Sequence, residues 1–334
     1  MSAPPALDVK PSAPSGADGA GLAGNRRKLA DTVFRGAALG SGLSVLVILV
    51  LIAVSTTQKA WPVFQEEGIG FVTGSRWSPA LDIYGALAFI AGTMIVSAIA
   101  LVFAVPVSIG IALFLSELAP RRLRQIVIYV VDLLAAIPSV VFGLWGLIVL
   151  APAIVNVYDW IADTVDPVPV LNVLFGKPAH GRSFFTAGLI LALMITPIIT
   201  SLTREVFDTV PAGQKEAAWA LGATRWEMIR GAVFPHSRSG MTGAVMLGLG
   251  RAMGETIAAA LVIGSSARLT AHLFSGGDAM AAVIANQFGE AGGLHRSALV
   301  AMGVVLFGMT IIVNMVARAI VGRAPSTVPI RGRR

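Results

Sequence analysis

The stretch VPAGQKEAAWALGATRWEMIRGAVFPHSRSG, residues 210–240, lies between two long apolar runs and predicts a pair of short helices. Residues 213–221 suit one short helix, and Gly222 suits the left-handed conformation that commonly ends a helix. Thr224 and Glu227 have the T-x-x-E spacing of a capping box, which starts a second helix. The stretch therefore predicts a helix-turn-helix hairpin.

The second helix of this hairpin is expected to end near Pro235, because proline disrupts a helix interior. Trp219 and Trp226 would both be costly to leave in water. We therefore expect something to cover the hairpin. The alternative is an ordinary surface hairpin that rests on lipid headgroups.

Uncharged runs flank the hairpin and recur along the chain of 334 residues, of which 55% are hydrophobic and 13% charged. Each run can cross the hydrocarbon core of a bilayer, which takes about 20 helical residues. The sequence predicts an all-α polytopic membrane protein with six transmembrane helices, in the runs 36–58, 83–116, 133–158, 183–203, 239–267 and 297–317. The second run is too long for one straight span, and Pro106 predicts a kink or an extension beyond the bilayer.

Lysine and arginine are distributed unevenly over the segments between these runs. Of the 25 Lys and Arg residues, 18 lie in the alternate segments that include both termini and the hairpin, 6 lie in the other segments, and Arg251 lies within a run. Because positive charges accumulate on the cytoplasmic side, both termini and the hairpin are predicted to be cytoplasmic. The net charge of +7 follows from this bias and from contact with anionic lipids, and needs no nucleic acid.

The sequence predicts no catalytic, metal or cofactor site in this chain. It has no cysteine, and its four histidines are scattered without the spacing of metal ligands. No G-x-x-x-x-G-K-[ST] loop is present, since Lys177 is followed by proline. We therefore do not expect an enzyme.

The hairpin resembles the EAA loop of the permease subunits of ABC importers, whose motif is E-A-A-x3-G-x9-I-x-L-P. The matching residues are Glu216, Ala217, Ala218, Gly222 and Pro235; Ala232 and Phe234 replace the usual Ile and Leu and remain apolar. The resemblance implies that the hairpin docks in a groove of a separate ATPase subunit. Glu216 would then lie near its polar contacts, and Gly222 would permit close approach.

One apolar run carries two charges. Arg251 and Glu255 are the only charged residues between Arg238 and Arg268, and Gly250 and Gly254 beside them form a G-x-x-x-G pair. Arg251 and Glu255 lie four residues apart, so they are predicted to share one face of a helix. The guanidinium suits an oxyanion, with Glu255 balancing it when no anion is bound and Thr256 adding a hydroxyl. The alternative is an ion pair that only locks two helices.

The segments GRAMGET (250–256) and IPSVVFGLWG (137–146), with the EAA loop, are similar to PstC-type permeases of bacterial phosphate importers. The likeness runs from about residue 25 to 320. It implies the type I ABC-importer permease (MetI-like) fold in the cytoplasmic membrane and a role for Arg251 and Glu255 in phosphate passage. It also implies as partners a second, PstA-type permease, two copies of a PstB-type ATPase that binds ATP, and an extracytoplasmic PstS-type phosphate-binding protein.

With this resemblance, residues 25–324 are predicted to form the six-helix permease domain, with the coupling loop at 211–235. Residues 1–24, rich in Pro, Ala, Gly and Ser, are predicted to be a disordered cytoplasmic tail. Residues 325–334 are predicted to be a basic cytoplasmic tail.

In the segment 137–146, Pro138 and Gly143 are predicted to break the helix and to form a gate or line a cavity. Packing of a kinked helix without direct function is the alternative. Asp132, just before this segment, is expected near the cytoplasmic end of its run, in a structural or interfacial role.

Three other functions remain open for a chain with these features. An ABC permease for another oxyanion would share the fold and the hairpin. An ion-coupled secondary carrier would use Arg251 and Glu255 in a proton or sodium relay and has no use for an EAA hairpin. A membrane scaffold for phosphate sensing would need the same partners but no pathway.

Overall fold

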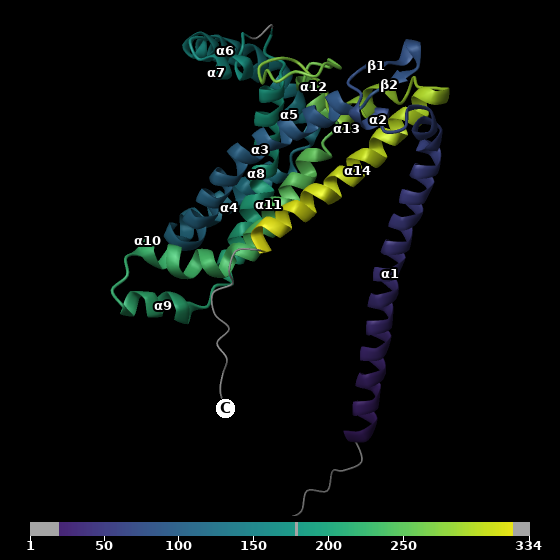
Figure 1. The fold of residues 1–334 in the computed structure, drawn as a ribbon. Helices are drawn as coiled ribbons and strands as arrows, with labels where there is room; N and C mark the ends of the chain where they lie inside the picture. Colours follow the sequence, from purple (N-terminus) through teal and green to yellow (C-terminus); the bar gives the residue numbers. More distant parts are fainter. Residues whose placement is uncertain (1–19, 178–179, 323–334) are drawn as a thin grey trace, which may run out of the picture. The chain divides into compact units, whose positions relative to one another are not determined.

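The structure, a computed structural model, describes residues 20–177 and 180–322 and is mainly helical (Figure 1). Its α-helices are α1 (Ala20–Glu67), α2 (Gly70–Thr73), α3 (Leu87–Leu113), α4 (Arg121–Ala136), α5 (Ser139–Trp145), α6 (Ala151–Val165), α7 (Pro169–Leu174), α8 (Phe184–Asp208), α9 (Ala212–Ala220), α10 (Arg225–Met228), α11 (Phe234–Met253), α12 (Ile257–Val262), α13 (Met280–Gln287) and α14 (Gly293–Gly322). Shorter elements are the 3-10 turn η1 (Pro79–Leu81), the π turns η2 (Phe114–Leu118), η3 (Gly146–Leu150) and η4 (Ile229–Val233), and the paired antiparallel strands β1 (Trp77–Ser78) and β2 (Ile83–Tyr84). The predicted all-α class is confirmed.

The predicted tails lie largely outside the described residues. The structure begins at Ala20, within the predicted tail 1–24, and residues 20–24 belong to α1. The predicted C-terminal tail, 325–334, lies entirely outside the described residues.

Five helices in the described part of the chain are long and apolar enough to cross a membrane: Asp31–Glu67, Leu87–Leu118, Ser139–Val165, Phe184–Asp208 and Gly293–Ala319. The sixth predicted run, 239–267, is divided between α11 and α12. The chain is therefore multi-pass as predicted, but the count of six continuous spans is not confirmed.

The long run 83–116 is accommodated by its two ends. Its first residues form β2, and helix α3 starts only at Leu87. The helix then continues through Pro106 and lengthens into the π turn η2. The residues before Leu87 therefore lie outside the helix, and the extension predicted for this run is found at its C-terminal end, in η2.

Helices α3 and α8 form the centre of the packed region, and small residues bring them together. A Cβ added at Gly188 in α8 would lie 2.4 Å from Cγ2 of Ile99 in α3. The buried residues around this contact include Ala100, Ala104 and Ala187. Small residues at a membrane helix interface let backbones approach, so that van der Waals packing holds the helices together. The two helices therefore form one tightly packed pair.

The end of α3 that is remote from the hairpin is fixed to the segment 264–279. A Cβ added at Gly92 would lie 2.0 Å from the backbone oxygen of Asp278, so only glycine fits there. The hydroxyl of Thr93 accepts a hydrogen bond from the Met280 N–H at 3.0 Å. The Asp278 side chain is buried, and this burial raises its pKa to about 6. Backbone contact therefore joins α3 to this segment.

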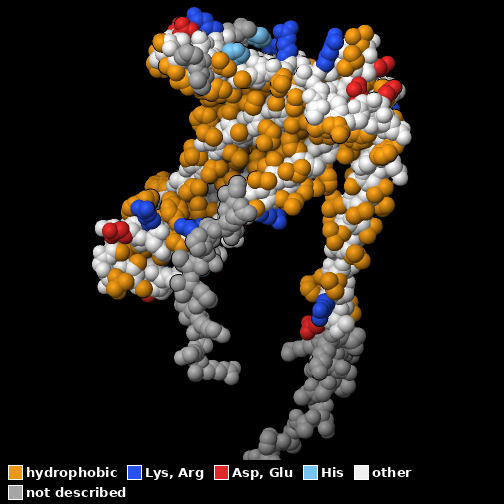
Figure 2. Space-filling model, in the orientation of Figure 1, with side chains coloured by type: hydrophobic (Ala, Val, Ile, Leu, Met, Phe, Trp, Pro, Cys, Tyr) orange, Lys and Arg blue, Asp and Glu red, His pale blue; other side chains and the backbone are white. Residues whose placement is uncertain are grey.

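The chain divides into two units, residues 1–55 and 56–334. In the first unit, the apolar side chains of α1 from Val33 to Val54 are exposed around the helix, a pattern typical of a helix in lipid. In the second unit, Figure 2 shows apolar side chains over the middle of the helices and charged side chains toward their ends. This distribution fits a bilayer, whose core excludes charge.

Candidate functional site

The hairpin predicted for residues 210–240 is present, and its turn has the predicted chemistry. Helix α9 is followed by Gly222, which has a φ of +80°. The N–H of Thr224 donates to Glu227 Oε2 at 2.7 Å, and the N–H of Glu227 donates to Thr224 Oγ1 at 3.4 Å. The Thr224 hydroxyl also donates to Glu227 Oε2 at 2.8 Å. The two bonds from Thr224 to the carboxylate, that of the backbone N–H first and that of the hydroxyl second, lower the pKa of Glu227. The capping box is confirmed.

The prediction that the second helix ends near Pro235 is wrong. The chain stays helical from α10 through η4 into α11, and Pro235 occupies an early position of α11. Because the helix is continuous across the junction of η4 and α11, Pro235 lacks the N–H that would bond a carbonyl of the preceding turn, and its ring crowds that turn. The π turn directly before it widens the helix locally. This local geometry explains why the helix continues.

The hairpin presents side chains that the described chain does not cover. Trp219, Leu221 and Trp226 are exposed apolar residues. Of the motif residues, Glu216 and Ala217 are exposed, and Ala218 is half-buried against a small core at the base of the hairpin. An exposed apolar patch of this kind is typical of a protein interaction site.

Arg251 and Glu255 lie on either side of a helix break, not on one helical face. Helix α11 ends at Met253 with Gly254 as its cap, and α12 begins at Ile257. Oε1 of Glu255 accepts a hydrogen bond from the N–H of Ala258 at 3.3 Å. The prediction of a continuous helix here is therefore wrong. A side chain that bonds a nearby backbone N–H competes with the helical ladder, which accounts for the break.

Because the helix is broken, Arg251 and Glu255 do not form an ion pair. The three ion pairs within 4.0 Å in the described chain join other residues. Arg251 is exposed, whereas Glu255 and Thr256 are half-buried. Across residues 20–177 and 180–322 the guanidinium thus has no carboxylate partner, and Glu255 acts as an acceptor at the start of α12. Broken helices at membrane depth are typical of transporter binding sites.

The segment 137–146 contacts the element that follows the break. Helix α4 ends at Ala136 and α5 begins at Ser139, so the predicted break at Pro138 is confirmed. The predicted break at Gly143 is wrong, because α5 continues through it. A Cβ at Gly143 would lie 2.8 Å from Cα of Ala258 in α12. Gly143 therefore permits close packing of α5 on α12, and the structure brings the two segments together.

Comparison with known proteins identifies the family. The family model described as binding-protein-dependent transport system inner membrane component matches residues 104–324. The phosphate transport system permease protein PstC of Mesorhizobium japonicum is 45% identical over 295 residues, covering 88% of this chain and 90% of the relative. The PstC protein of Haemophilus influenzae is 43% identical over 286 residues, covering 85% and 91%. This chain belongs to the PstC family of permeases.

A solved structure supports the fold of this PstC-family chain. A bacterial ABC transporter involved in the import of the acidic polysaccharide alginate aligns with a TM-score of 0.55. The alignment is 18% identical and covers 89% of this chain and 99% of that chain. At this identity the likeness concerns the fold alone, which is that of an ABC-importer permease.

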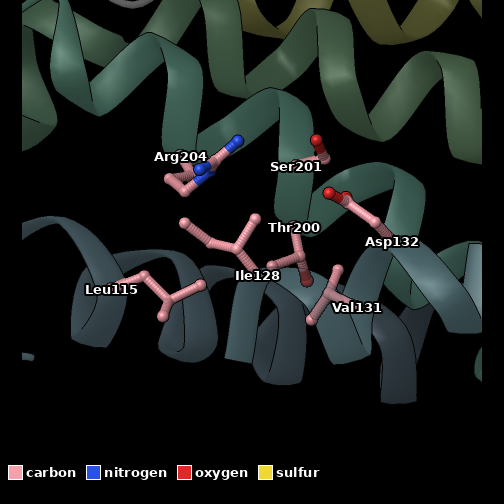
Figure 3. A pocket seen from close by; sticks show the side chains of 7 residues that line it. All are labelled: Leu115, Ile128, Val131, Asp132, Thr200, Ser201 and Arg204. Carbon is pink, nitrogen blue, oxygen red and sulfur yellow. The ribbon is translucent and has the colours of Figure 1, made fainter. Parts of the chain in front are cut away.

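A separate crevice lies between α4, η2 and α8 of this PstC-family chain (Figure 3). It is a shallow depression open to solvent, lined by Leu115, Ile128, Val131, Asp132, Thr200, Ser201 and Arg204. Asp132 is exposed, as expected for a residue near the end of a run, and makes no ion pair with Arg204. Because Arg251, Glu255 and Thr256 do not line this crevice, it is distinct from the predicted pathway site.

Sequence reasoning missed the contacts that attach the hairpin to the membrane helices. Lys215 in α9 forms an ion pair with Glu117 in η2, and Arg124 in α4 forms one with Asp208 in α8. Two features of the sequence point to this pair. Lys215 adjoins the EAA motif, and Glu117 is the sole carboxylate between run 83–116 and Pro120. Local sequence patterns cannot predict the ion pair between Lys215 and Glu117, because the two residues are 98 positions apart in the chain.

Proposed function

We propose that this chain is the permease subunit of an ATP-driven phosphate importer and forms half of the transmembrane phosphate pathway. Its PstC relatives are named for phosphate transport, and they cover most of the chain. The observation that carries the pathway assignment is the exposed guanidinium of Arg251. It lies at a helix break within an apolar run and makes no ion pair with a carboxylate among the residues that the structure describes.

The chemistry of Arg251 suits phosphate. A guanidinium is always charged and donates paired hydrogen bonds that match the oxygens of a tetrahedral oxyanion. A charge near the bilayer centre costs about 2.5–3.5 kcal/mol on insertion scales, so such a residue usually faces an aqueous path or a protein interior. Glu255 holds the start of α12 through Ala258, and so keeps Arg251 at the end of α11. The break itself then presents the cation to the anion.

The proposed assembly follows from what this chain lacks. One arginine supplies half of an oxyanion clamp, so a second, PstA-type permease would provide the facing cation. Two PstB-type ATPases would bind ATP and receive the hairpin at 211–235 in a groove, which would cover Trp219 and Trp226. A PstS-type protein would deliver phosphate at the extracytoplasmic side. Both termini would be cytoplasmic, as the distribution of Lys and Arg predicts.

The proposed cycle is a rigid-body alternation of access. Closure of the ATPase dimer on ATP would pull the hairpin and rotate the membrane helices, so that the pathway opens outward. Hydrolysis would reset it. ATP would therefore be used by the partner, and this chain would carry out transport without catalysis.

The first test measures phosphate uptake in cells that lack their own importer and express the four subunits with Arg251→Ala. Loss of a charge-assisted contact to the substrate should reduce uptake by at least about 30-fold, while the complex still assembles. Arg268→Ala is the control, because Arg268 is also exposed but lies in the segment after α12. Normal uptake by Arg251→Ala would overturn the assignment.

The second test uses Glu216→Arg in the hairpin, with co-purification of the ATPase as the readout. The reversed charge should release the ATPase and abolish uptake. Retention of the ATPase would contradict the docking role of the EAA loop. Competition by sulfate or molybdate would indicate another oxyanion, uptake that survives ATP depletion would indicate a secondary carrier, and an altered transcriptional response alone would indicate a scaffold.

A further inference from the structure

We infer that the ion pair between Lys215 and Glu117 is the link that transmits movement of the hairpin to helix α3. The inference rests on the proposed function, since it requires an ATPase that moves the hairpin. Both residues are thereby coupling residues that act through the helices and contact neither phosphate nor ATP.

The pair is short and more buried than the other ion pairs in the described chain. Lys215 Nζ lies 2.5 Å from Glu117 Oε1, and the two side chains are 19% and 7% exposed. The Arg124–Asp208 pair is 33% and 42% exposed, and the Lys177–Asp163 pair is 71% and 62% exposed. Solvent screens exposed pairs strongly, whereas loss of one partner from a buried pair leaves an uncompensated charge. Removal of the Lys215–Glu117 pair is therefore expected to have a larger effect than removal of either of the two exposed pairs.

Helix α9 packs on α10 and η4, which belong to the hairpin itself, and the Lys215–Glu117 pair connects it to η2. None of its residues is buried, and Ala218 is its one contributor to the core at the base of the hairpin. Within the described residues, Lys215 makes the side-chain hydrogen bond that joins α9 to another element, and the acceptor is Glu117. The remaining members of this core come from α10, η4, α11 and the ends of α3 and α8. Helix α9 carries the EAA residues, so its attachment determines where an applied force goes.

The ion pair directs that force to α3. Glu117 lies in the π turn η2, which continues α3 without interruption. A side chain on α9 is thus connected to a helix that spans the membrane. Helix α3 packs against both α8 and α11, and α11 ends two residues after Arg251. A displacement of Lys215 therefore reaches the helix that holds the proposed phosphate site.

A charge reversal tests the pair in the assembled importer, reconstituted in vesicles with the ATPase and the binding protein. Lys215→Glu and Glu117→Lys should each lower the phosphate transported per ATP hydrolysed by about 2- to 30-fold, the range typical of residues along a coupling route. The ATPase should stay bound. The double variant should restore transport per ATP, because the opposite charges again meet.

Lys177→Glu is the matched control, because it reverses a lysine in an exposed pair and should leave transport per ATP unchanged. The inference is overturned if both single variants transport normally, if the double variant is no better than the singles, or if Lys215→Glu releases the ATPase. Release would mean that Lys215 contacts the ATPase directly.

Two further variants keep the test informative if the reversed charges prevent assembly. Lys215→Met and Glu117→Gln leave no reversed charge near the base of the hairpin, and the same fall in transport per ATP is expected. Assembled complexes of both variants with normal coupling would overturn the inference. Failure of the proposed function is recognised separately, because it appears as retention of the ATPase by Glu216→Arg or as normal uptake by Arg251→Ala.

Discussion

Helix α8 contains a proline and is continuous, whereas the run from α11 to α12 is broken at a point that contains none. In α8 the hydroxyl of Thr196 donates to the Ala192 carbonyl at 2.7 Å, and Ser108 of α3 donates to the Thr196 carbonyl at 3.1 Å. Side chains therefore serve carbonyls around Pro197, as is usual for prolines in membrane helices. At the other site the Glu255 carboxylate takes the backbone N–H of Ala258.

The difference shows that the neighbouring side chains, and not proline alone, decide where a membrane helix breaks. A proline that is surrounded by packed helices and hydroxyl donors is tolerated. A glutamate that caps the next helix can divide an apolar run without any proline. The break also places an unpaired arginine at a helix end, where a continuous helix would have set it beside a carboxylate.

The largest effect on this arrangement is expected from Gly143→Leu. The new side chain would collide with the backbone of Ala258, and overpacking of this kind costs about 1–3 kcal/mol. The thermal midpoint of the purified complex should fall and uptake should drop. Gly110→Leu is the control, because no atom lies within 4 Å of a Cβ added at that glycine in α3. Equal effects of the two variants would refute the packing role of Gly143.

Glu255→Ala should have the next largest effect, because it removes the acceptor at the start of α12. Loss of a helix-capping side chain typically costs about 1 kcal/mol. Glu255→Gln keeps an oxygen acceptor and removes the charge, so it should retain stability close to that of the parent. If uptake is normal in Glu255→Gln and lowered in Glu255→Ala, the cap is what matters; equal loss in both would favour the charge.

Pro197→Ala should change stability by no more than about 0.5 kcal/mol, because the helix is already continuous at this position. The thermal midpoint and the uptake rate are the measurements. A large loss of uptake would show that Pro197 contributes to movement of α8. The comparison of α8 with the break between α11 and α12 would then have to include function as well as helix continuity.

The smallest effect concerns Glu227, the third residue of α10, whose carboxylate accepts a hydrogen bond from the N–H of the N-cap residue Thr224. Its pKa is lowered in the folded chain, so the stability that it contributes is present above its unfolded pKa and is lost as the pH falls through the folded value. Thr224→Ala removes the side-chain donor and should raise this pKa toward its ordinary value. An NMR titration of the Glu227 carboxylate would check the shift; an unchanged pKa would contradict the hydrogen-bond origin.

The sequence predicted local features well where their signals are short and specific. The capping box of Thr224 and Glu227, the left-handed Gly222 and the break at Pro138 each depend on residues within one turn, and all are present. Five of the six predicted runs overlap helices that are long and apolar enough to cross a membrane, because hydrophobicity determines these positions, whereas the run 239–267 is divided between α11 and α12.

The features that sequence reasoning missed depend on contacts between distant segments. Gly143 was expected to break its helix, but its role is to admit Ala258, a residue on another helix. The break at Gly254 depends on where the Glu255 side chain bonds, and helical periodicity cannot distinguish that from a continuous span. The Lys215–Glu117 pair joins segments whose neighbourhood only the fold establishes.

The close contact of α3 with α8 has a consequence for communication across the membrane. Because Gly188 lets α8 lie directly against Ile99, helices α3 and α8 form one tightly packed pair. One end of this helix pair carries Glu117 and the hairpin, and the other end contacts Asp278 through Gly92. We expect a displacement at one end of the pair to move the other end as well. Arrival of cargo at the Asp278 end and engagement of the hairpin at the other end would thus act on the same pair of helices.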